Sequence, residues 1–376
     1  MLTIIRIRRN ISIRQFIFEE TRECKQFNIS IMKRRKFLKS SAFAGLGTML
    51  TAYGLHRQSK SAPTDVKVGI IGLDTSHSPA FAKLLNSGEE PLYNGYRVVA
   101  AYPYGSRDIQ ECVNRIPEYQ KEFETMGIEI TSSIDELVRK SDVVLLETCD
   151  GRPHLEQAIP VIRAKKPMFI DKPIAASLAD TIAVFELSEK NNVPVFSSSS
   201  LRYMSSVKEV VSGKIGNVIG ADAYSPATIE KTHPDLFWYG IHGVEPLYAV
   251  MGTGCKSISR TYTESTDICV GLWNDGRIGT FRGTRKGRSD FGGYAYGDRG
   301  NKVLGPWEGY KPLLDEIIHF FKTGIVSIKP EETIEIFAFM EAADVCKQHG
   351  GKAVLIENVM NKARTDAKNI MMKYSV

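Results

Sequence analysis

The sequence predicts a two-domain α/β protein in which a Rossmann-like parallel sheet domain precedes an α+β domain with an open antiparallel sheet. Between residues 63 and 197 short apolar runs alternate with segments of helical length, which is typical of parallel strands joined by right-handed crossovers. From residue 198 to 356 short strands follow one another across turn sequences such as Asn274-Asp275-Gly276. The length of 376 residues also exceeds one ordinary domain.

The first domain is expected to contain six strands, each a short apolar run bounded by turn residues or helical segments. Ser78 is expected to cap the first helix, with Pro79 at its first position, and Ser133 is expected to cap a later one. The expected strands are residues 66–71, 97–102, 128–130, 142–146, 167–170 and 194–196, and the expected helices are residues 80–86, 134–139, 154–164 and 177–191.

The second domain is expected to be rich in short strands with helices over one face. The sequence Gly297-Asp298-Arg299-Gly300 predicts a second hairpin turn. A tail from residue 357 to 376 carries apolar residues at helical spacing and predicts a closing helix. The expected strands are residues 218–224, 257–263, 268–273, 278–284, 292–296 and 302–304, and the expected helices are residues 201–212, 311–322 and 331–349.

The net charge of +6 is concentrated in the first 62 residues. They hold 13 of the 49 basic and 3 of the 43 acidic residues, so the body is mildly acidic. The body has no basic stripe interleaved with aromatic residues, which argues against a nucleic-acid partner. Residues 1–62 are interpreted as an export leader whose signal starts at Met32, where a basic segment precedes a short apolar one.

The pair Arg34-Arg35 followed by Phe37 resembles the twin-arginine export signal of bacteria. The resemblance implies a periplasmic protein with no stable membrane span after signal cleavage; an uncleaved anchor is the alternative. Five cysteines of the body lie far apart without CxxC spacing, so the sequence suggests neither a zinc site nor a disulfide framework.

Lys172 follows a short strand within Asp171-Lys172-Pro173. The carboxyl end of a strand in an open α/β sheet faces the ligand crevice, so this ammonium group is well placed to meet a bound substrate. The alternative is a lysine at the end of a strand that faces water.

The turn after the first strand should carry the glycines that bind the phosphates of a dinucleotide. Gly72 is present, but Asp74 and His77 stand where the second and third glycines are expected, with Thr75 and Ser76 between them. Three possibilities follow: the cofactor is displaced, Asp74 turns away to cap Ser76, or no dinucleotide binds. After the second strand, Ser106 and Arg107 favour NADP over NAD weakly, because no acid stands at the ribose position.

Six ordered landmarks resemble those of the Gfo/Idh/MocA oxidoreductases, from about residue 66 to residue 356. They are Gly69-Ile70-Ile71-Gly72, Pro153-His154, Asp171-Lys172-Pro173-Ile174, Leu201-Arg202-Tyr203, Gly213-Lys214-Ile215-Gly216 and Gly240-Ile241-His242. The resemblance implies a nicotinamide cofactor, NAD or NADP, bound through the turn residues with Ser106, Arg107, His154, Asp171 and Lys172. It also implies His242 as the acceptor of a hydroxyl proton, with Lys172 beside the reacting oxygen.

One departure from the family pattern concerns the proton acceptor. The family often has an aspartate four residues before the histidine, where this chain has Trp238. His233 or Asp235 is a candidate to replace it. Glu245 stands where the family often has Asp. A metal held by His233, His242 and Glu245 is the alternative, although the sequence favours no metal. Residues expected near the sugar ring, as a stacking floor or alternatively as core, are Trp238, Tyr239, Tyr203 and Tyr224.

The resulting hypothesis is an exported oxidoreductase that transfers hydride between a sugar or glycoside and tightly bound NAD(P). Tight binding is expected because no dissolved nicotinamide pool exists outside the cytoplasm. The alternatives are an NAD-dependent glycoside-cleaving enzyme of the same fold and a carbohydrate-binding protein that has lost the cofactor. The family resemblance also implies a homo-oligomer formed through the open sheet face.

Overall fold

The computed structural model describes residues 65–374, and the predicted export signal lies outside this range. The first domain is built on a six-stranded sheet in which all strands are parallel, in the order β3-β2-β1-β4-β5-β6. This order reverses direction between β1 and β4, which confirms the predicted Rossmann-like domain. Its strands are β1 (Val66–Ile71), β2 (Tyr96–Tyr102), β3 (Glu129–Ile130), β4 (Val143–Leu146), β5 (Met168–Asp171) and β6 (Val195–Ser198).

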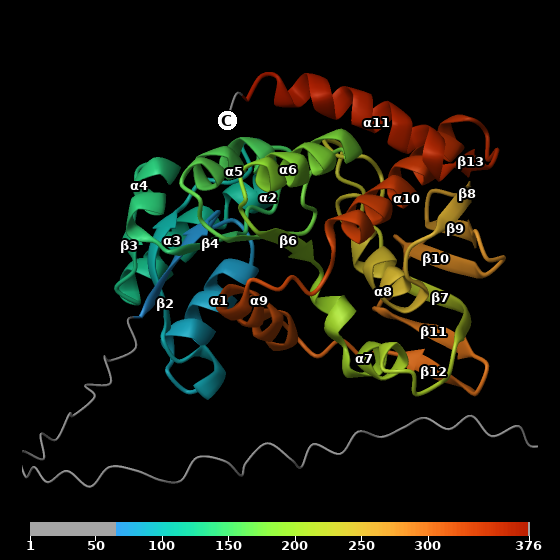
Figure 1. The fold of residues 1–376 in the computed structure, drawn as a ribbon, viewed down its shortest axis with the longest axis horizontal. Helices are drawn as coiled ribbons and strands as arrows, with labels where there is room; N and C mark the ends of the chain where they lie inside the picture. Colours follow the sequence, from blue (N-terminus) through green and yellow to red (C-terminus); the bar gives the residue numbers. More distant parts are fainter. Residues whose placement is uncertain (1–64, 375–376) are drawn as a thin grey trace, which may run out of the picture. The chain divides into compact units, whose positions relative to one another are not determined.

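Helices cover both faces of this sheet (Figure 1), with α5 and α6 on one side and α1 and α9 on the other. Ser133 caps its helix as predicted, because its side chain accepts from the Glu136 amide. The predicted cap at Ser78 is wrong: the first helix starts earlier, after Ser76, and the Ser78 hydroxyl donates to the Gly72 carbonyl instead. The helices are α1 (His77–Asn86), α2 (Gln110–Val113), α3 (Ile116–Thr125), α4 (Ile134–Lys140), α5 (His154–Arg163) and α6 (Leu178–Lys190).

The second domain contains a seven-stranded sheet in the order β12-β11-β7-β10-β9-β8-β13. Most neighbouring strands of this sheet pair antiparallel, which confirms the prediction, and β7 and β10 pair in parallel. Both predicted hairpin turns are present, between β9 and β10 and between β11 and β12. The strands are β7 (Val218–Pro226), β8 (Cys255–Tyr262), β9 (Thr266–Trp273), β10 (Ile278–Thr284), β11 (Gly292–Gly297), β12 (Gly300–Leu304) and β13 (Val354–Leu355).

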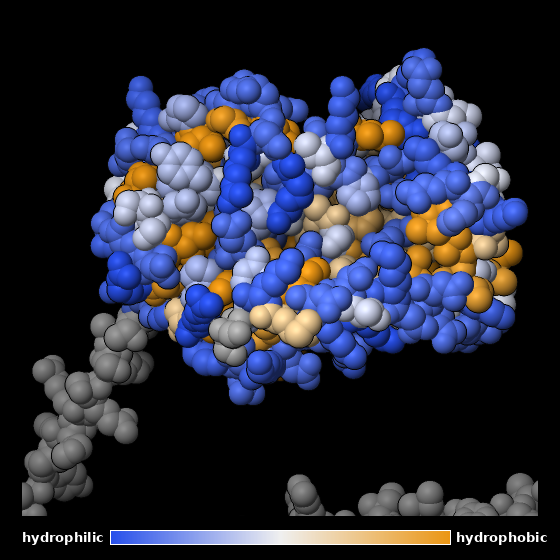
Figure 2. Space-filling view, turned by 90° about the horizontal axis from the view of Figure 1, so that it is seen from above, coloured by the Kyte–Doolittle hydropathy of each residue, from blue (hydrophilic) through white to orange (hydrophobic). Residues whose placement is uncertain are grey.

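One face of the seven-stranded sheet is covered by helices, and the other is open. The open face carries exposed apolar side chains on several strands, including Tyr224, Leu272 and Ile278. Figure 2 shows hydrophobic surface gathered at the end of the molecule that holds this sheet. The helices after β6 are α7 (Ser205–Val211), α8 (Ile241–Met251), α9 (Lys311–Thr323), α10 (Pro330–Gln348) and α11 (Ile356–Met371).

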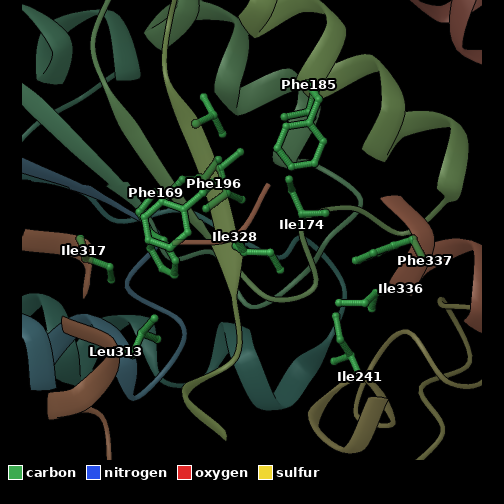
Figure 3. Close-up of a cluster of buried hydrophobic side chains, with 14 of the residues drawn as sticks. Phe169, Ile174, Phe185, Phe196, Ile241, Leu313, Ile317, Ile328, Ile336 and Phe337 are labelled. Atoms are coloured by element: carbon green, nitrogen blue, oxygen red, sulfur yellow. The ribbon is translucent and has the colours of Figure 1, made fainter. Parts of the chain in front are cut away.

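The hydrophobic core runs without interruption from the first sheet into the helices of the second domain (Figure 3). Phe196 of β6 packs edge-on against Phe320 of α9, with ring centroids 5.0 Å apart. The tail helix α11 lies along α6 of the first domain (Figure 1). This shared core holds the carboxyl ends of the parallel strands opposite α8, where the candidate site lies. None of the helices between residues 65 and 374 combines the length and the apolarity needed to cross a bilayer.

Candidate active site

Lys172 and His242 line one cavity of about 490 Å³. Lys172 follows the last residue of β5, and His242 is the second residue of α8. Trp238 and Tyr239 line the same cavity from the segment before α8, and Thr75, Ser76 and His77 line it from the first turn and the start of α1. The fold thus brings together residues of both domains that the sequence patterns indicated separately.

His242 is held by a serine that was not predicted from the sequence. The Ser199 hydroxyl lies 2.8 Å from Nδ1 of His242. The Tyr239 ring packs edge-on against the imidazole, with centroids 4.9 Å apart. Burial, with Lys172 and His77 nearby, holds the pKa of His242 well below its usual value. The imidazole is therefore neutral near pH 7, which is the state that accepts a proton.

Residues between β12 and α9 close the cavity on the side of the first turn. The Tyr310 hydroxyl lies 3.2 Å from the Ser76 hydroxyl, and the Tyr310 ring lies 4.3 Å from the His77 ring, centroid to centroid. The indole N–H of Trp307 donates to the Ser200 hydroxyl at 3.0 Å. Aromatic faces with polar edges therefore surround this space, and such surfaces suit a sugar ring.

Asp74 turns into the protein interior and does not cap Ser76. Its carboxylate is buried and accepts from the backbone N–H of Ser106 at 2.7 Å and of Cys149 at 3.0 Å. Burial raises the pKa of Asp74 despite these two hydrogen bonds. A Cβ atom at Gly105 would lie 2.2 Å from an Asp74 oxygen, so the residue after β2 must be this small. The carboxylate thus links the segments that follow β2 and β4.

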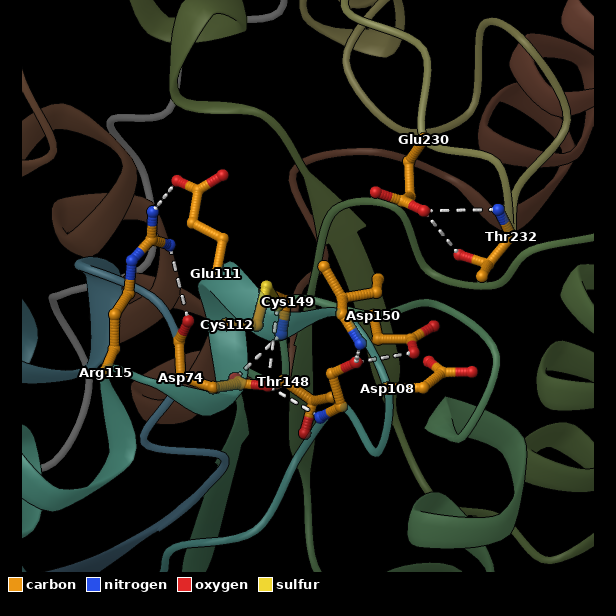
Figure 4. The surroundings of a disulfide bond; sticks show 12 residues. Asp74, Asp108, Glu111, Cys112, Arg115, Thr148, Cys149, Asp150, Glu230 and Thr232 are labelled. Atoms are coloured by element: carbon orange, nitrogen blue, oxygen red, sulfur yellow. Dashed lines mark hydrogen bonds and ion pairs between the residues drawn. A yellow bond between two sulfur atoms is a disulfide. The ribbon is translucent and has the colours of Figure 1, made fainter.

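A disulfide joins the same two segments (Figure 4). It connects Cys112 of α2 with Cys149 after β4, and this corrects the expectation that the cysteines form no disulfide. Because β2 and β4 are the neighbours of β1 in the sheet, the bridge crosses over the carboxyl end of β1. In a Rossmann fold the pyrophosphate of a dinucleotide lies at that end.

Two cavities at the carboxyl ends of the parallel strands fit the two halves of a dinucleotide. Asp74 lies between them. A cavity of about 730 Å³ beside β2 is lined by Ser106 and Arg107, and it suits the adenosine half. The cavity with Lys172 suits the nicotinamide half. Gly72 has a φ of 90°, and a Cβ atom there would lie 2.5 Å from the Thr148 amide nitrogen, so the turn retains the close packing of the fingerprint. The Asp74 carboxylate is the part of the turn that opposes a pyrophosphate.

Three other residues predicted to bind cofactor serve the protein itself. Arg107 pairs with Glu156 at 2.9 Å on the surface, and the Ser106 hydroxyl donates to Asp150. His154 is buried, with its ring nitrogens 3.2 Å from the Ile174 carbonyl oxygen and 2.8 Å from the Thr148 carbonyl oxygen. His154 therefore fixes the loops after β4 and β5 to each other and lines neither cavity.

Four residues predicted to bind substrate lie away from the cavity, which corrects their assignment. Tyr203 is buried, with its hydroxyl 2.6 Å from the Ser327 hydroxyl. The Glu245 carboxylate accepts from Arg202 at 2.8 Å, because a buried carboxylate requires such a partner. Asp235 pairs with Arg260 of β8 and with Lys347 of α10.

His233 is the fourth of these residues, and its Nε2 lies 3.3 Å from an Asp150 oxygen of the first domain. His233 and Glu245 are thus engaged with different partners, so the alternative of a metal held by these two residues and His242 is wrong. Tyr224, the fourth member of the predicted stacking floor, lies half-exposed on β7 and not in the cavity.

Ser199, Glu147 and Trp307 were not predicted from the sequence. Ser199 belongs to a run of four serines, which by itself indicates only a polar link. Glu147 directly follows the apolar strand β4, and a carboxylate at the carboxyl end of a buried parallel strand is the signal that could have identified it. Nothing in the local sequence around Trp307 indicates that its indole reaches Ser200 at the cavity.

The fold and cavity define a two-domain protein with a nucleotide-binding type of α/β domain and a site at the carboxyl ends of its strands. Residues 66–199 match the sequence profile described as "Oxidoreductase family, NAD-binding Rossmann fold", the Gfo/Idh/MocA family. The matched residues cover the first domain.

Two curated relatives and a solved structure illustrate the similarity. An inositol 2-dehydrogenase of Salmonella typhimurium is 21% identical over 217 residues, which are 55% of this chain and 61% of the relative. The uncharacterized oxidoreductase YhhX of Escherichia coli is 26% identical over 140 residues, 33% of this chain and 40% of the relative. The chain thus spans less than two thirds of either relative. The scyllo-inositol dehydrogenase of Lactobacillus casei, solved with NAD(H) and scyllo-inositol, is 15% identical to this chain. The two structures superimpose with a TM-score of 0.62 over 78% of this chain and 99% of that one, so they share the same fold.

Proposed function

We propose that this protein is an NAD(P)-dependent oxidoreductase that acts on a CH–OH group of a sugar, an inositol or a glycoside. The observation that carries the proposal is the shared cavity of Lys172 and His242, which places a cation and a neutral imidazole around one space of about 490 Å³. The names of the relatives, inositol dehydrogenases, support the substrate class.

In the proposed reaction the chain binds the substrate hydroxyl and moves its proton. His242 takes the proton at Nε2, which requires that Nδ1 carries the other proton and donates it to the Ser199 hydroxyl oxygen. Lys172 stabilises the oxygen while its negative charge develops. Trp238 and Tyr239 hold the apolar face of the ring. A nicotinamide bound beside Lys172 would supply the hydride acceptor.

Two measurements test the proposal. Denaturing the purified native protein should release NAD(P) into the supernatant, detectable by enzymatic cycling. Lys172→Ala and His242→Ala should each lose most of the activity on a panel of inositols and hexoses, while Lys214→Ala, on the exposed surface, should retain it. Full turnover in either of the first two variants would contradict the assigned roles.

A cofactor-free carbohydrate-binding protein is the second candidate, and the observation that favours it is the Asp74 carboxylate on the Ser106 and Cys149 amides. Binding of sugars without released or added NAD(P) would support this candidate. Release of free sugar from a glycoside without an added oxidant would instead indicate the glycoside-cleaving enzyme.

Export and assembly are further parts of the proposal. The Arg34-Arg35 sequence supports twin-arginine export to the periplasm, and retention of the cofactor would then be required. The exposed Tyr224, Leu272 and Ile278 on the open sheet face support a homo-oligomer. Fractionation of expressing cells tests the proposed export. Light scattering of the purified protein tests the proposed homo-oligomer, and a monomer would contradict it.

A further inference from the structure

Three ionisable side chains converge behind the wall of the cavity that contains Lys172. Asp171 ends β5, Glu147 follows β4 and His77 begins α1. Because β1, β4 and β5 are parallel neighbours, their carboxyl ends meet at one edge of the sheet. Nδ1 of His77 lies 2.9 Å from Oδ2 of Asp171 and 3.8 Å from Oε2 of Glu147.

The acidic side chains of this cluster have few compensating partners in the described part of the chain. Glu147 and Asp171 are fully buried, and neither Glu147 oxygen accepts a hydrogen bond from residues 65–374, while the charged groups close to Asp171 are the His77 ring and the Lys172 ammonium group. Nδ1 of His77 also makes no hydrogen bond of acceptable direction, although an Asp171 oxygen is only 2.9 Å away. Buried groups in this state require a compensating partner, since an unpaired buried charge is costly.

The spacing matches the ligands of a metal ion. Two ligand atoms each about 2.1 Å from one ion lie about 3.0 Å apart when they subtend about 90°, and about 3.8 Å apart at about 130°. The two measured separations have these values. One imidazole with two carboxylates suits Zn²⁺, Mn²⁺ or Fe²⁺ better than Ca²⁺, which takes six to eight oxygen ligands.

We infer that His77, Glu147 and Asp171 bind one divalent transition-metal ion behind the cavity. The ion reaches the cluster along His77, which lines the cavity. It compensates the two carboxylates, while Lys172 lies on the outer side of Asp171 with Nζ 4.0 Å from Oδ2. This inference does not depend on the proposed reaction, because the three side chains would bind the ion whether or not a nicotinamide cofactor is present.

The competing arrangement has a proton in place of the ion. Burial and the nearby Asp171 raise the pKa of Glu147 well above its usual value, so a protonated Glu147 could coexist with the other two groups. The two arrangements differ in metal content and in the behaviour of Glu147→Gln, which imitates the protonated acid.

The test measures binding of Zn²⁺ and Mn²⁺ to the chelator-treated full chain by isothermal titration calorimetry, with metal content determined by plasma mass spectrometry. The expected result is about one equivalent of bound metal, with no comparable binding of Ca²⁺. Glu147→Gln should weaken binding by about 100-fold or more, because loss of an outer partner of a ligand alone costs about 10- to 100-fold. Unchanged binding in Glu147→Gln, or no binding in the wild type, would overturn the inference.

Two control variants test whether the ion binds at this cluster and not elsewhere in the described part of the chain. Glu341→Gln changes a partly buried glutamate of α10 and should bind metal like the wild type. Changing Cys112 and Cys149 together to serine removes both sulfur atoms of another group with metal-like spacing, Asp74, Cys112 and Cys149, and this double variant should also bind normally. Loss of metal in the double variant alone would place the ion there and overturn the inference.

A spectroscopic measurement on the wild-type protein covers the case in which Glu147→Gln fails to fold. Co²⁺ bound to one imidazole and two carboxylates should give weak visible ligand-field bands without an intense thiolate-to-cobalt band in the near ultraviolet. A strong thiolate band would contradict the inference, because the cluster contains no sulfur ligand.

Discussion

Replacing Asp74 with alanine is expected to tighten NAD(P) binding by about 10- to 1,000-fold. Asp74 lies three residues after the end of β1, and its carboxylate accepts from the Ser106 and Cys149 amides. The pyrophosphate of a dinucleotide lies at that end of β1 in a Rossmann fold. Two like charges about 4 Å apart repel by about 4 kcal/mol at an effective dielectric of about 20. Because a factor of ten in affinity corresponds to about 1.4 kcal/mol, the full repulsion is worth nearly 1,000-fold.

The lower end of this range allows for protonation of Asp74. Burial raises its pKa, and a protonated carboxyl does not repel a pyrophosphate. The affinity of the wild type should therefore rise as the pH falls toward that pKa, because the folded protein then carries a neutral group at this point. The affinity of Asp74→Ala should lack this dependence. The variant also frees the Ser106 and Cys149 amides to donate to the ligand.

The assay is titration calorimetry with NAD and NADP on protein freed of endogenous nucleotide by charcoal. Asp142→Ala is the matched control, since Asp142 is an exposed aspartate that accepts from the Lys67 amide at the opposite, amino end of β1. It should bind like the wild type. Equal or weaker binding by Asp74→Ala, with an unchanged melting temperature, would refute the idea that this carboxylate opposes the cofactor.

Three further changes test other parts of the structure. Ser199→Ala should lower kcat about fivefold and flatten the acidic limb of the pH profile, which should lie below pH 6.5 because the pKa of His242 is depressed. Cys112→Ser should lower the free energy of unfolding by about 2–4 kcal/mol, because the disulfide joins residues 37 positions apart. Arg260→Met should cost about 3–5 kcal/mol in a urea titration, because it leaves the largely buried Asp344 carboxylate without its ion-pair partner and Asp267 with Arg285 alone.

Each of these changes has a control. Ser198→Ala removes a hydroxyl that donates to a backbone carbonyl and should leave the pH profile unchanged. A reducing agent should destabilise the wild type as much as Cys112→Ser and leave the variant unaffected. Arg277→Met breaks only an exposed pair with Asp275 and should cost less than about 1 kcal/mol. Equal effects of variant and control would contradict the corresponding interpretation.

Local patterns in the sequence determined the architecture and the position of Lys172. Alternating apolar runs and helical segments predict the parallel sheet, since the periods of strands and helices are set by neighbouring residues. The turn at Asn274-Asp275-Gly276 was also predictable from neighbouring residues. In the structure Gly276 adopts a φ of 87° at this turn. The ordered landmarks around Lys172 and His242 indicated the family without any knowledge of their distance.

The tertiary structure alone decided which side chains meet. Glu147, His77 and Asp171 are far apart in the sequence and converge only because β4, β1 and β5 are neighbours in the sheet. The same strand order brings Cys112 to Cys149. Glu245 is three residues from His242, yet its carboxylate pairs with Arg202, because a buried charge takes the partner that the packing provides. Strand order and burial are long-range properties, and no local pattern of residues encodes them.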